Sequence, residues 1–371
     1  MIIMRTNPKP LSKRLNFFVI SFFVFFLSSQ AYAFNPIGFY EGLMGNSGVA
    51  LTEPTAASYY NPSLLILKPT SSVSLGGNTF SNFKSNVDGV EWSSAQLSPS
   101  YLSSVQAFDV FVHEFFLSQM YFLDTQVTTQ SNGGTFDYDI RTQGYYVGYS
   151  FAFKGFPMGF QFVLRVSDQK TIGFYSNETP QTVIKSDIRG SNRKADLMLG
   201  LGAHHQFGDY TFGYRYLSRG ARVYSHTDGK TTSAVFNLAG NTYSKIESDF
   251  KLDSEPLAGQ IVVIGHSFKA GSHEYLTDTQ MEEDGSLTNS FTWTQTFGYR
   301  LNFDKQNQFL CGIAHQIGSE IKYFGQSAYY SAGYSWLTRA NRSAVGLYYT
   351  SQNLDNDMRV YGVTFSSEFT Y

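Results

Sequence analysis

The chain has 371 residues with 29 acidic and 27 basic side chains, a formal charge of −2 at neutral pH and a mean hydropathy of −0.21. This balance lacks the basic excess with which nucleic-acid-binding proteins neutralise phosphates, so we expect no nucleic-acid partner. Aromatic side chains make up 17% and charged ones only 15%. This composition is typical of a membrane chain in which every second residue of a strand faces lipid, rather than one that crosses the membrane with apolar helices.

Residues 1–33 have the features of a cleaved export signal. Four basic side chains precede an apolar run from Phe17 to Leu27, and an Ala-Tyr-Ala pattern ends at Ala33. The run is shorter than the roughly 20 residues that a spanning helix needs. We therefore predict a signal peptide and a mature start at Phe34, with an uncleaved anchor as the alternative. Without the signal, 23 basic and 29 acidic side chains remain, a net charge of about −6.

Residues 34–70 do not alternate between apolar and polar side chains. They carry four prolines, which the interior of a sheet tolerates poorly, so we expect this segment to lie apart from the strands. Asn61 precedes Pro62, and this order favours a turn over the continuation of a helix.

The stretch from Gly48 to Pro62 resembles the start of the FadL-type outer-membrane channels for long-chain fatty acids and other hydrophobic molecules. In that family a small hatch plugs the barrel and carries a glycine, a small residue and an alanine, then an acidic residue, small residues, an aromatic residue and Asn-Pro-Ala. The matching positions here are Gly48, Ala50, Glu53, Tyr60, Asn61 and Pro62. Ser63 departs from the final alanine. The resemblance implies a hatch at 34–70 inside a barrel made by 71–371, and the mature chain is short for the family.

From Ser71 onward, apolar side chains alternate with small or polar ones, as in strands that face lipid on one side and a lumen on the other. The segments that show this most clearly are 145–153, 160–167, 197–202, 297–303 and 329–336. We predict an all-β fold, a transmembrane antiparallel β-barrel of about 14 strands, an even number as in bacterial single-chain barrels. The usual strand number of the FadL-type family agrees with this count.

Turn residues divide the alternating segments. Among the predicted turns are Gly208-Asp209, Asp228-Gly229 and Asp304 to Asn307. The longer polar stretches 177–194 and 226–251 are predicted to be extracellular loops, because such barrels keep their periplasmic turns short.

The last segment of the chain alternates and ends on an aromatic residue. Its apolar register includes Phe365, Phe369 and Tyr371. This resembles the C-terminal signal that the barrel assembly machinery reads, so we expect that machinery and outer-membrane lipids as partners, and the outer membrane of a Gram-negative-type bacterium as the location. The alternative is an ordinary edge strand that stops at Tyr371.

Three arginines lie in registers that we assign to the lumen. Arg165, Arg215 and Arg300 should point inward, because a charge on the lipid face costs roughly 2 to 4 kcal/mol near the bilayer midplane. They are candidates for binding the carboxylate of a fatty acid; the alternative is that they pair with lumenal acids such as Glu368 or hold the hatch. Aromatic residues of 108–123 and the mature start at 34–40 are candidates for lining an apolar pocket.

The functional hypothesis is passive uptake of hydrophobic molecules such as long-chain fatty acids, gated by movement of the hatch. A porin for hydrophilic solutes and a lipid-hydrolysing barrel enzyme are the alternatives. For the enzyme, pairs such as His266-Ser267 lack a recognisable catalytic spacing, and adjacent residues on a strand point to opposite faces. The sequence shows no metal-binding or phosphate-binding motif, so we expect no catalytic residues, no metal and no cofactor. Cys311 lies in a strand-like segment and is interpreted as packing.

Overall fold

The computed structural model describes residues 40–51, 56–67, 71–87, 90–96, 105–112, 115–131, 134–179, 181–238, 240–249, 257–283, 291–317, 326–338, 341–353 and 357–370. The signal peptide prediction therefore falls outside the described residues. Before the strands come two short α-helices and a 3-10 helix, α2 (Tyr40–Leu43), α3 (Ala57–Tyr60) and η1 (Pro62–Leu67). None of the helices in these ranges is long and apolar enough to cross a membrane. The turn predicted at Asn61 and Pro62 is present: α3 ends before Asn61, whose backbone is extended, and η1 begins at Pro62.

All of the strand segments belong to one antiparallel sheet. They are β1 (Ser72–Val87), β2 (Val90–Gln96), β3 (Val105–Val112), β4 (Phe115–Ser131), β5 (Gly134–Phe153), β6 (Phe156–Glu178), β7 (Thr182–Phe207), β8 (Tyr210–Leu217), β9 (Ala221–Asn237), β10 (Thr242–Asp249), β11 (Ile261–Ala270), β12 (His273–Glu283), β13 (Phe291–Asn302), β14 (Asn307–Ile317), β15 (Gln326–Leu337), β16 (Asn341–Asn353) and β17 (Asp357–Thr370).

The 17 segments form 14 full strands. Three strands are each described as two segments: β2 and β3 both pair with β1, β8 and β9 both pair with β7, and β10 and β11 pair with β9 and β8 respectively. The first and last strands pair with each other, from Ser72 opposite Thr370 onward, and this ladder closes the barrel. The predicted antiparallel barrel of about 14 strands is confirmed.

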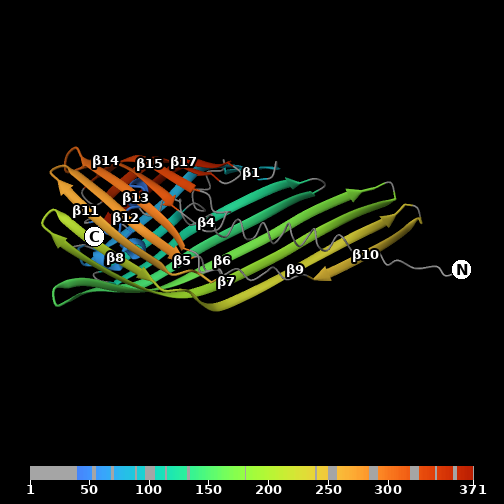
Figure 1. The fold of residues 1–371 in the computed structure, drawn as a ribbon, viewed down its shortest axis with the longest axis horizontal. Helices are drawn as coiled ribbons and strands as arrows, with labels where there is room; N and C mark the ends of the chain where they lie inside the picture. The colour runs from blue at the N-terminus through green and yellow to red at the C-terminus, as the bar shows by residue number, and fades with distance from the viewer. Residues whose placement is uncertain are drawn as a thin grey trace.

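Several strands extend far beyond the length that a membrane requires. β6 has 23 residues and β7 has 26, whereas about 10 residues suffice for a tilted strand to span a bilayer. Together with β9 and β10 they form a long projection on one side of the barrel (Figure 1). The predicted loops at 177–194 and 226–251 are therefore wrong over most of their length. Their polar residues continue the β-ladder, because strands outside lipid need no apolar face.

The opposite rim carries the tight turns. Lys154 and Gly155 join β5 to β6 with φ values of 50° and 83°, and Gly208, with φ of 60°, begins the turn between β7 and β8. The predicted turn at Gly208-Asp209 is thus confirmed, whereas Asp228-Gly229 lies inside β9. The tight turns and the projection therefore lie at opposite ends of the barrel.

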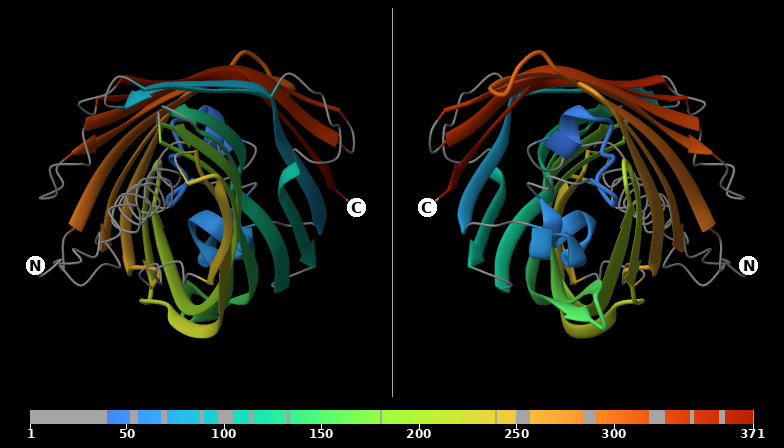
Figure 2. Two further views of the ribbon diagram at one scale, coloured as in Figure 1. Left: turned by 90° about the vertical axis from the view of Figure 1, so that its right-hand side faces the viewer. Right: turned by 90° about the vertical axis from the view of Figure 1, so that its left-hand side faces the viewer.

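Exposure alternates along the strands as the sequence pattern predicts. In β6, Phe160 and Phe162 are 39% and 45% exposed, while Gln161 and Val163 between and beside them are buried. The inward side chains do not surround an empty lumen, because the N-terminal helices lie inside the ring of strands (Figure 2). We call the described residues 40–67 inside the barrel the hatch.

Candidate functional site

The hatch is held together by a buried carboxylate. Glu41 in α2 is fully buried, and its Oε1 accepts a hydrogen bond of 3.0 Å from the backbone nitrogen of Ala56, which precedes α3. Gly48 lies against this pair: a Cβ there would be 2.7 Å from Glu41 Cγ and 2.7 Å from the Tyr60 ring. Tyr60 in turn donates from its hydroxyl to Asn46 Oδ1 at 3.3 Å. The glycine that begins the hatch motif is therefore needed for the hatch to close on itself.

A carboxylate of the barrel wall binds the hatch backbone. Asp278 of β12 accepts hydrogen bonds at Oδ2 from the backbone nitrogens of Gly48, at 2.7 Å, and Val49, at 3.0 Å. Next to it, Ser47 donates to Thr296 Oγ1 of β13 at 2.7 Å. Hydrogen bonds to a buried charged acceptor are stronger than neutral ones, so Asp278 is a principal anchor of the hatch.

Asn61 uses both ends of its amide to join hatch and wall. Its Nδ2 donates to the carbonyl oxygens of Val49 in the hatch, at 2.9 Å, and Ala203 in β7, at 3.0 Å. Its Oδ1 accepts from Ser63, from the backbone nitrogen at 3.1 Å and from the hydroxyl at 2.7 Å. The Ser63 oxygen lies 3.0 Å from Nδ1 of His204. Ser63, the departure from the family pattern, thus has its own partner in the wall.

Glycines of the wall let the hatch backbone approach closely. A Cβ at Gly202 would lie 2.1 Å from Asn61 Oδ1, and one at Gly159 would lie 2.6 Å from the Pro62 carbonyl carbon. In β8, which pairs with β7, a Cβ at Gly213 would lie 2.1 Å from the Val49 oxygen. On the other side of the hatch, one at Gly312 would lie 2.1 Å from the Gly45 nitrogen. These glycines come from β6, β7, β8 and β14, so the hatch is fitted to the wall on opposite sides.

The structure brings most of the predicted hatch residues together. Gly48, Ala50, Tyr60, Asn61 and Pro62 are all buried between hatch and wall, whereas Glu53 lies outside the described residues. The sequence did not predict Asp278 or His204 as partners of the hatch; His204 was considered only among the candidate residues of an enzyme. The sequence does show that each is an ionisable residue in the lumenal register of a strand. Neighbouring residues in the sequence do not show which atom of the hatch such a residue contacts.

A pocket lies beside the hatch on the lumenal face of β5 to β8, β11 and β12. It is lined by Tyr59, Tyr146, Val163, Arg165, Met198, Arg215, Leu217, Ile261, Gln280 and Glu282. Its cavity of about 30 Å³ has room for on the order of two water molecules. The pocket is predominantly apolar with a few charged groups, which is the composition of sites for small organic molecules.

Two of the three predicted arginines line this pocket. Arg165 enters it from β6 and Arg215 from β8, two strands that lie on either side of β7. The guanidinium carbon of Arg215 lies 4.8 Å from the centre of the Tyr59 ring. Arg300 lies elsewhere, 1% exposed, and forms a buried ion pair with Glu274. Glu274 is thus a lumenal acid that pairs with one of these arginines, as the alternative reading from the sequence expected of acids such as Glu368. All three arginines thus lie inward, but they do not form one cluster.

Of the predicted aromatic lining, the structure describes the side chains of 115–119, and among these Phe116 points inward. It is 3% exposed and packs in the buried cluster with Tyr60 and Tyr146, while Phe115 and Leu117 on either side are 62% and 57% exposed. The mature start at 34–39 lies outside the described residues.

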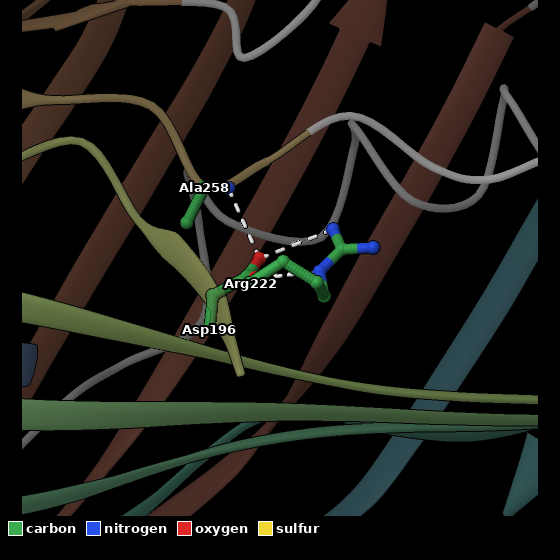
Figure 3. A network of polar contacts seen from close by, with 3 residues as sticks. All are labelled: Asp196, Arg222 and Ala258. Atoms are coloured by element: carbon green, nitrogen blue, oxygen red, sulfur yellow. Dashed lines mark hydrogen bonds and ion pairs between the residues drawn. The ribbon is translucent and has the colours of Figure 1, made fainter. Parts of the chain in front are cut away.

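A group of polar contacts, which we call the clasp, lies next to the pocket where the strand of β8 and β9 is interrupted. Asp196 of β7 forms an ion pair with Arg222 of β9 and accepts a hydrogen bond of 3.2 Å from the Ala258 nitrogen before β11 (Figure 3). The Gly220 nitrogen donates to the Ala258 oxygen at 2.7 Å. Leu217 and Ile261 of the pocket flank these residues, so the clasp and the pocket are adjacent.

The last strand presents its aromatic residues outward. Phe365 and Phe369 are 39% and 46% exposed on the face that carries the other lipid-exposed residues, and Tyr371 lies outside the described residues. Among the enzyme candidates, Ser267 is buried and donates to Glu274 at 2.9 Å, whereas His266 contacts Tyr210. In the part of the chain that the structure describes, no group of three His, Cys, Asp or Glu residues is placed to hold a metal ion.

Comparison with known proteins gave matches among solved structures alone: no family model and no curated protein matches the chain. The Pseudomonas putida toluene transporter TodX superposes with a TM-score of 0.62 at 10% identity, over 92% of this chain and 99% of that one. The Ralstonia pickettii toluene transporter TbuX gives 0.61 at 11%, over 90% and 98%. A Pseudomonas aeruginosa FadL homologue gives 0.54 at 14%, over 90% and 99%. The FadL-type fold expected from Gly48 to Pro62 is confirmed.

Proposed function

We propose that this chain is a FadL-type outer-membrane channel through which hydrophobic molecules, such as hydrocarbons or fatty acids, diffuse inward, and that it is not an enzyme. The observation that carries the proposal is the hatch, which is hydrogen-bonded to opposite sides of the wall beside an apolar pocket. The structurally similar channels are described as transporters of toluene and monoaromatic hydrocarbons.

Transport in this proposal requires movement of the hatch or of side chains next to it. The pocket cavity of about 30 Å³ is well below the roughly 150 Å³ of an apolar cavity that accepts benzene. A permeating molecule therefore enters only when part of the lining moves. Arg165 and Arg215 are the residues proposed to contact the ligand, and Arg300, paired with Glu274, is proposed to support the wall away from the pocket.

The remaining parts of the proposal concern the ends of the chain. Residues 1–33 direct export, 34–70 form the hatch, and 71–371 form the barrel. Phe365, Phe369 and Tyr371 are proposed to be read by the barrel assembly machinery, after which the outward aromatic residues contact outer-membrane lipids.

Reconstituted liposomes test the function. Vesicles containing the protein should take up radiolabelled toluene or oleate faster than empty vesicles, while glucose entry and ion conductance remain at background. Fast glucose entry with steady conductance would instead indicate a porin for hydrophilic solutes. Hydrolysis of the vesicle phospholipids would indicate the enzyme.

A further inference from the structure

The Tyr59 ring is surrounded in the way that a bound aromatic molecule would be. The Arg215 guanidinium lies 4.8 Å from the ring centre, a distance at which the cation is attracted to the π face. Tyr60 and Tyr146 approach in edge geometry, with ring centres 4.8 Å and 6.1 Å away and interplanar angles of 84° and 75°. A cation and two aromatic partners thus form three sides of a subsite for one ring.

Tyr59 is the one lining residue of this pocket that does not come from the barrel wall. The other nine lining residues lie on strands β5 to β8, β11 and β12, where hydrogen-bonded ladders fix the backbone. Tyr59 belongs instead to α3, a helix of four residues within the hatch. Since the cavity is too small for a ring, displacing Tyr59 is the least disruptive way to make room.

We propose that Tyr59 is an internal occupant of a ring-binding subsite formed by Arg215, Tyr146 and Tyr60, and that a neutral single-ring aromatic molecule takes its place. The inference rests on the proposed function for its biological use, but the subsite itself is defined by these contacts. An entering ring replaces the Tyr59 ring over the guanidinium. The contacts that Arg215, Tyr146 and Tyr60 make with Tyr59 in the closed pocket are then the contacts that recognise the ligand.

The charge state of Tyr59 fits a neutral ligand. Burial raises the pKa of the Tyr59 hydroxyl, and the nearby Arg215 only partly offsets this, so the side chain is an uncharged phenol at neutral pH. Arg215 is 2% exposed and its Nε has no hydrogen-bond partner among the described residues. An electron-rich ring, with or without a hydroxyl group, satisfies this buried cation better than a saturated ring does.

The test measures binding of toluene and of methylcyclohexane, which has a similar shape but no π face, to the full-length purified protein in detergent. Removal of the occupant in Tyr59→Ala should tighten toluene binding about tenfold and methylcyclohexane binding much less. Tyr59→Phe keeps the ring and should bind like the unaltered protein. Arg215→Met in the Tyr59→Ala background should reverse most of the gain for toluene.

Two outcomes overturn the proposal. Unchanged toluene binding in Tyr59→Ala shows that the ring does not occupy the subsite, and equal gains for both ligands show that the subsite does not recognise an aromatic face. Heat-modifiable gel migration verifies barrel assembly, and Tyr59→Val replaces Tyr59→Ala if the latter does not assemble. A crystal of the variant with bromobenzene should place the anomalous bromine signal at the former ring position.

The result can be separated from that of the liposome experiment. If the unaltered protein takes up toluene but Tyr59→Ala binds toluene no more tightly, the protein is a channel and Tyr59 does not occupy a ring-binding subsite. If Tyr59→Ala binds toluene more tightly but the unaltered protein shows no uptake, Tyr59 occupies the subsite and the protein is not such a channel.

Discussion

The carboxylate oxygen Oδ2 of Asp278 lies 2.7 Å from the backbone nitrogen of Gly48, so a side chain of the barrel wall binds the first residue of the hatch motif. Because the same oxygen also accepts from Val49, one wall residue restrains two consecutive amides of the hatch.

Replacing Asp278 should loosen the hatch. Asp278→Ala removes both hydrogen bonds and should shift the hatch equilibrium by about 3 kcal/mol, roughly a hundredfold in the open fraction. Asp278→Asn retains an acceptor oxygen and should have a smaller effect. Single-channel conductance in planar bilayers measures the opening, and hydrogen exchange of the Gly48 and Val49 amides reports the local release. Exchange as slow as in the unaltered protein would contradict the anchoring role.

A side chain at a wall glycine should displace the hatch. In Gly202→Ala the new Cβ would lie 2.1 Å from Asn61 Oδ1, closer than any real contact, so the Asn61 hydrogen bonds must break or the strand must shift. We expect increased conductance and faster exchange at Ser63. Gly240→Ala is the matched control, because its Cβ would be 3.7 Å from the nearest atom, and it should behave like the unaltered protein.

Ser63 and His204 should show coupled effects on stability. Ser63→Ala leaves His204 without this buried partner and should lower the free energy of unfolding by about 1 to 2 kcal/mol. Ser63→Ala combined with His204→Leu removes both polar groups and should cost less than the two single changes added together. Urea unfolding in detergent, followed by tryptophan fluorescence, provides the double-mutant cycle. Strict additivity would mean that the contact contributes nothing.

The Asp196 clasp should contribute more to stability than an exposed ion pair of the projection. Asp196 and Arg222 have side chains that are 10% and 20% exposed, so Asp196→Ala leaves a largely buried arginine and should lower the free energy of unfolding by about 2 kcal/mol. The control is Asp187→Ala, whose partner Arg189 is 74% exposed, and its effect should stay within about 0.5 kcal/mol. Equal losses in the two variants would show that the clasp has no special role.

The projection shows why strand lengths were not predictable from alternation. Alternating apolar residues mark where a strand crosses lipid, but they do not mark where it ends. The even-numbered register of β6 is apolar from Phe160 to Val166, charged at Asp168 and Lys170 and apolar again at Ile172 and Phe174, while the ladder continues to Glu178. Beyond the bilayer both faces of a strand meet water, so hydrogen bonding between backbones, which leaves no periodic signal, decides where the strand ends.

In the hatch and the pocket too, features that depend on neighbouring residues were predictable and contacts between distant residues were not. Asn61 and Pro62 were recognisable because a small plug requires a turn there and because the motif is local in the sequence. Asp278 was not recognisable, because its partner Gly48 lies 230 positions away in the sequence. Any acidic residue in the lumenal register would have looked the same in the sequence. Arg215 could be placed inward by its register, but its position over Tyr59 depends on how the hatch is seated.

The sequence by itself determined an antiparallel barrel of about 14 strands preceded by a segment that is not part of the sheet, because a period of two and its loss are properties of neighbouring residues. That this segment is a hatch was expected from the resemblance of Gly48 to Pro62 to the FadL-type family. Only the tertiary structure decided which wall residues hold the hatch and which side chains form the pocket. Those contacts join strands that are far apart in the chain, and they depend on the absence of a Cβ at particular glycines and on the direction in which each lumenal side chain points.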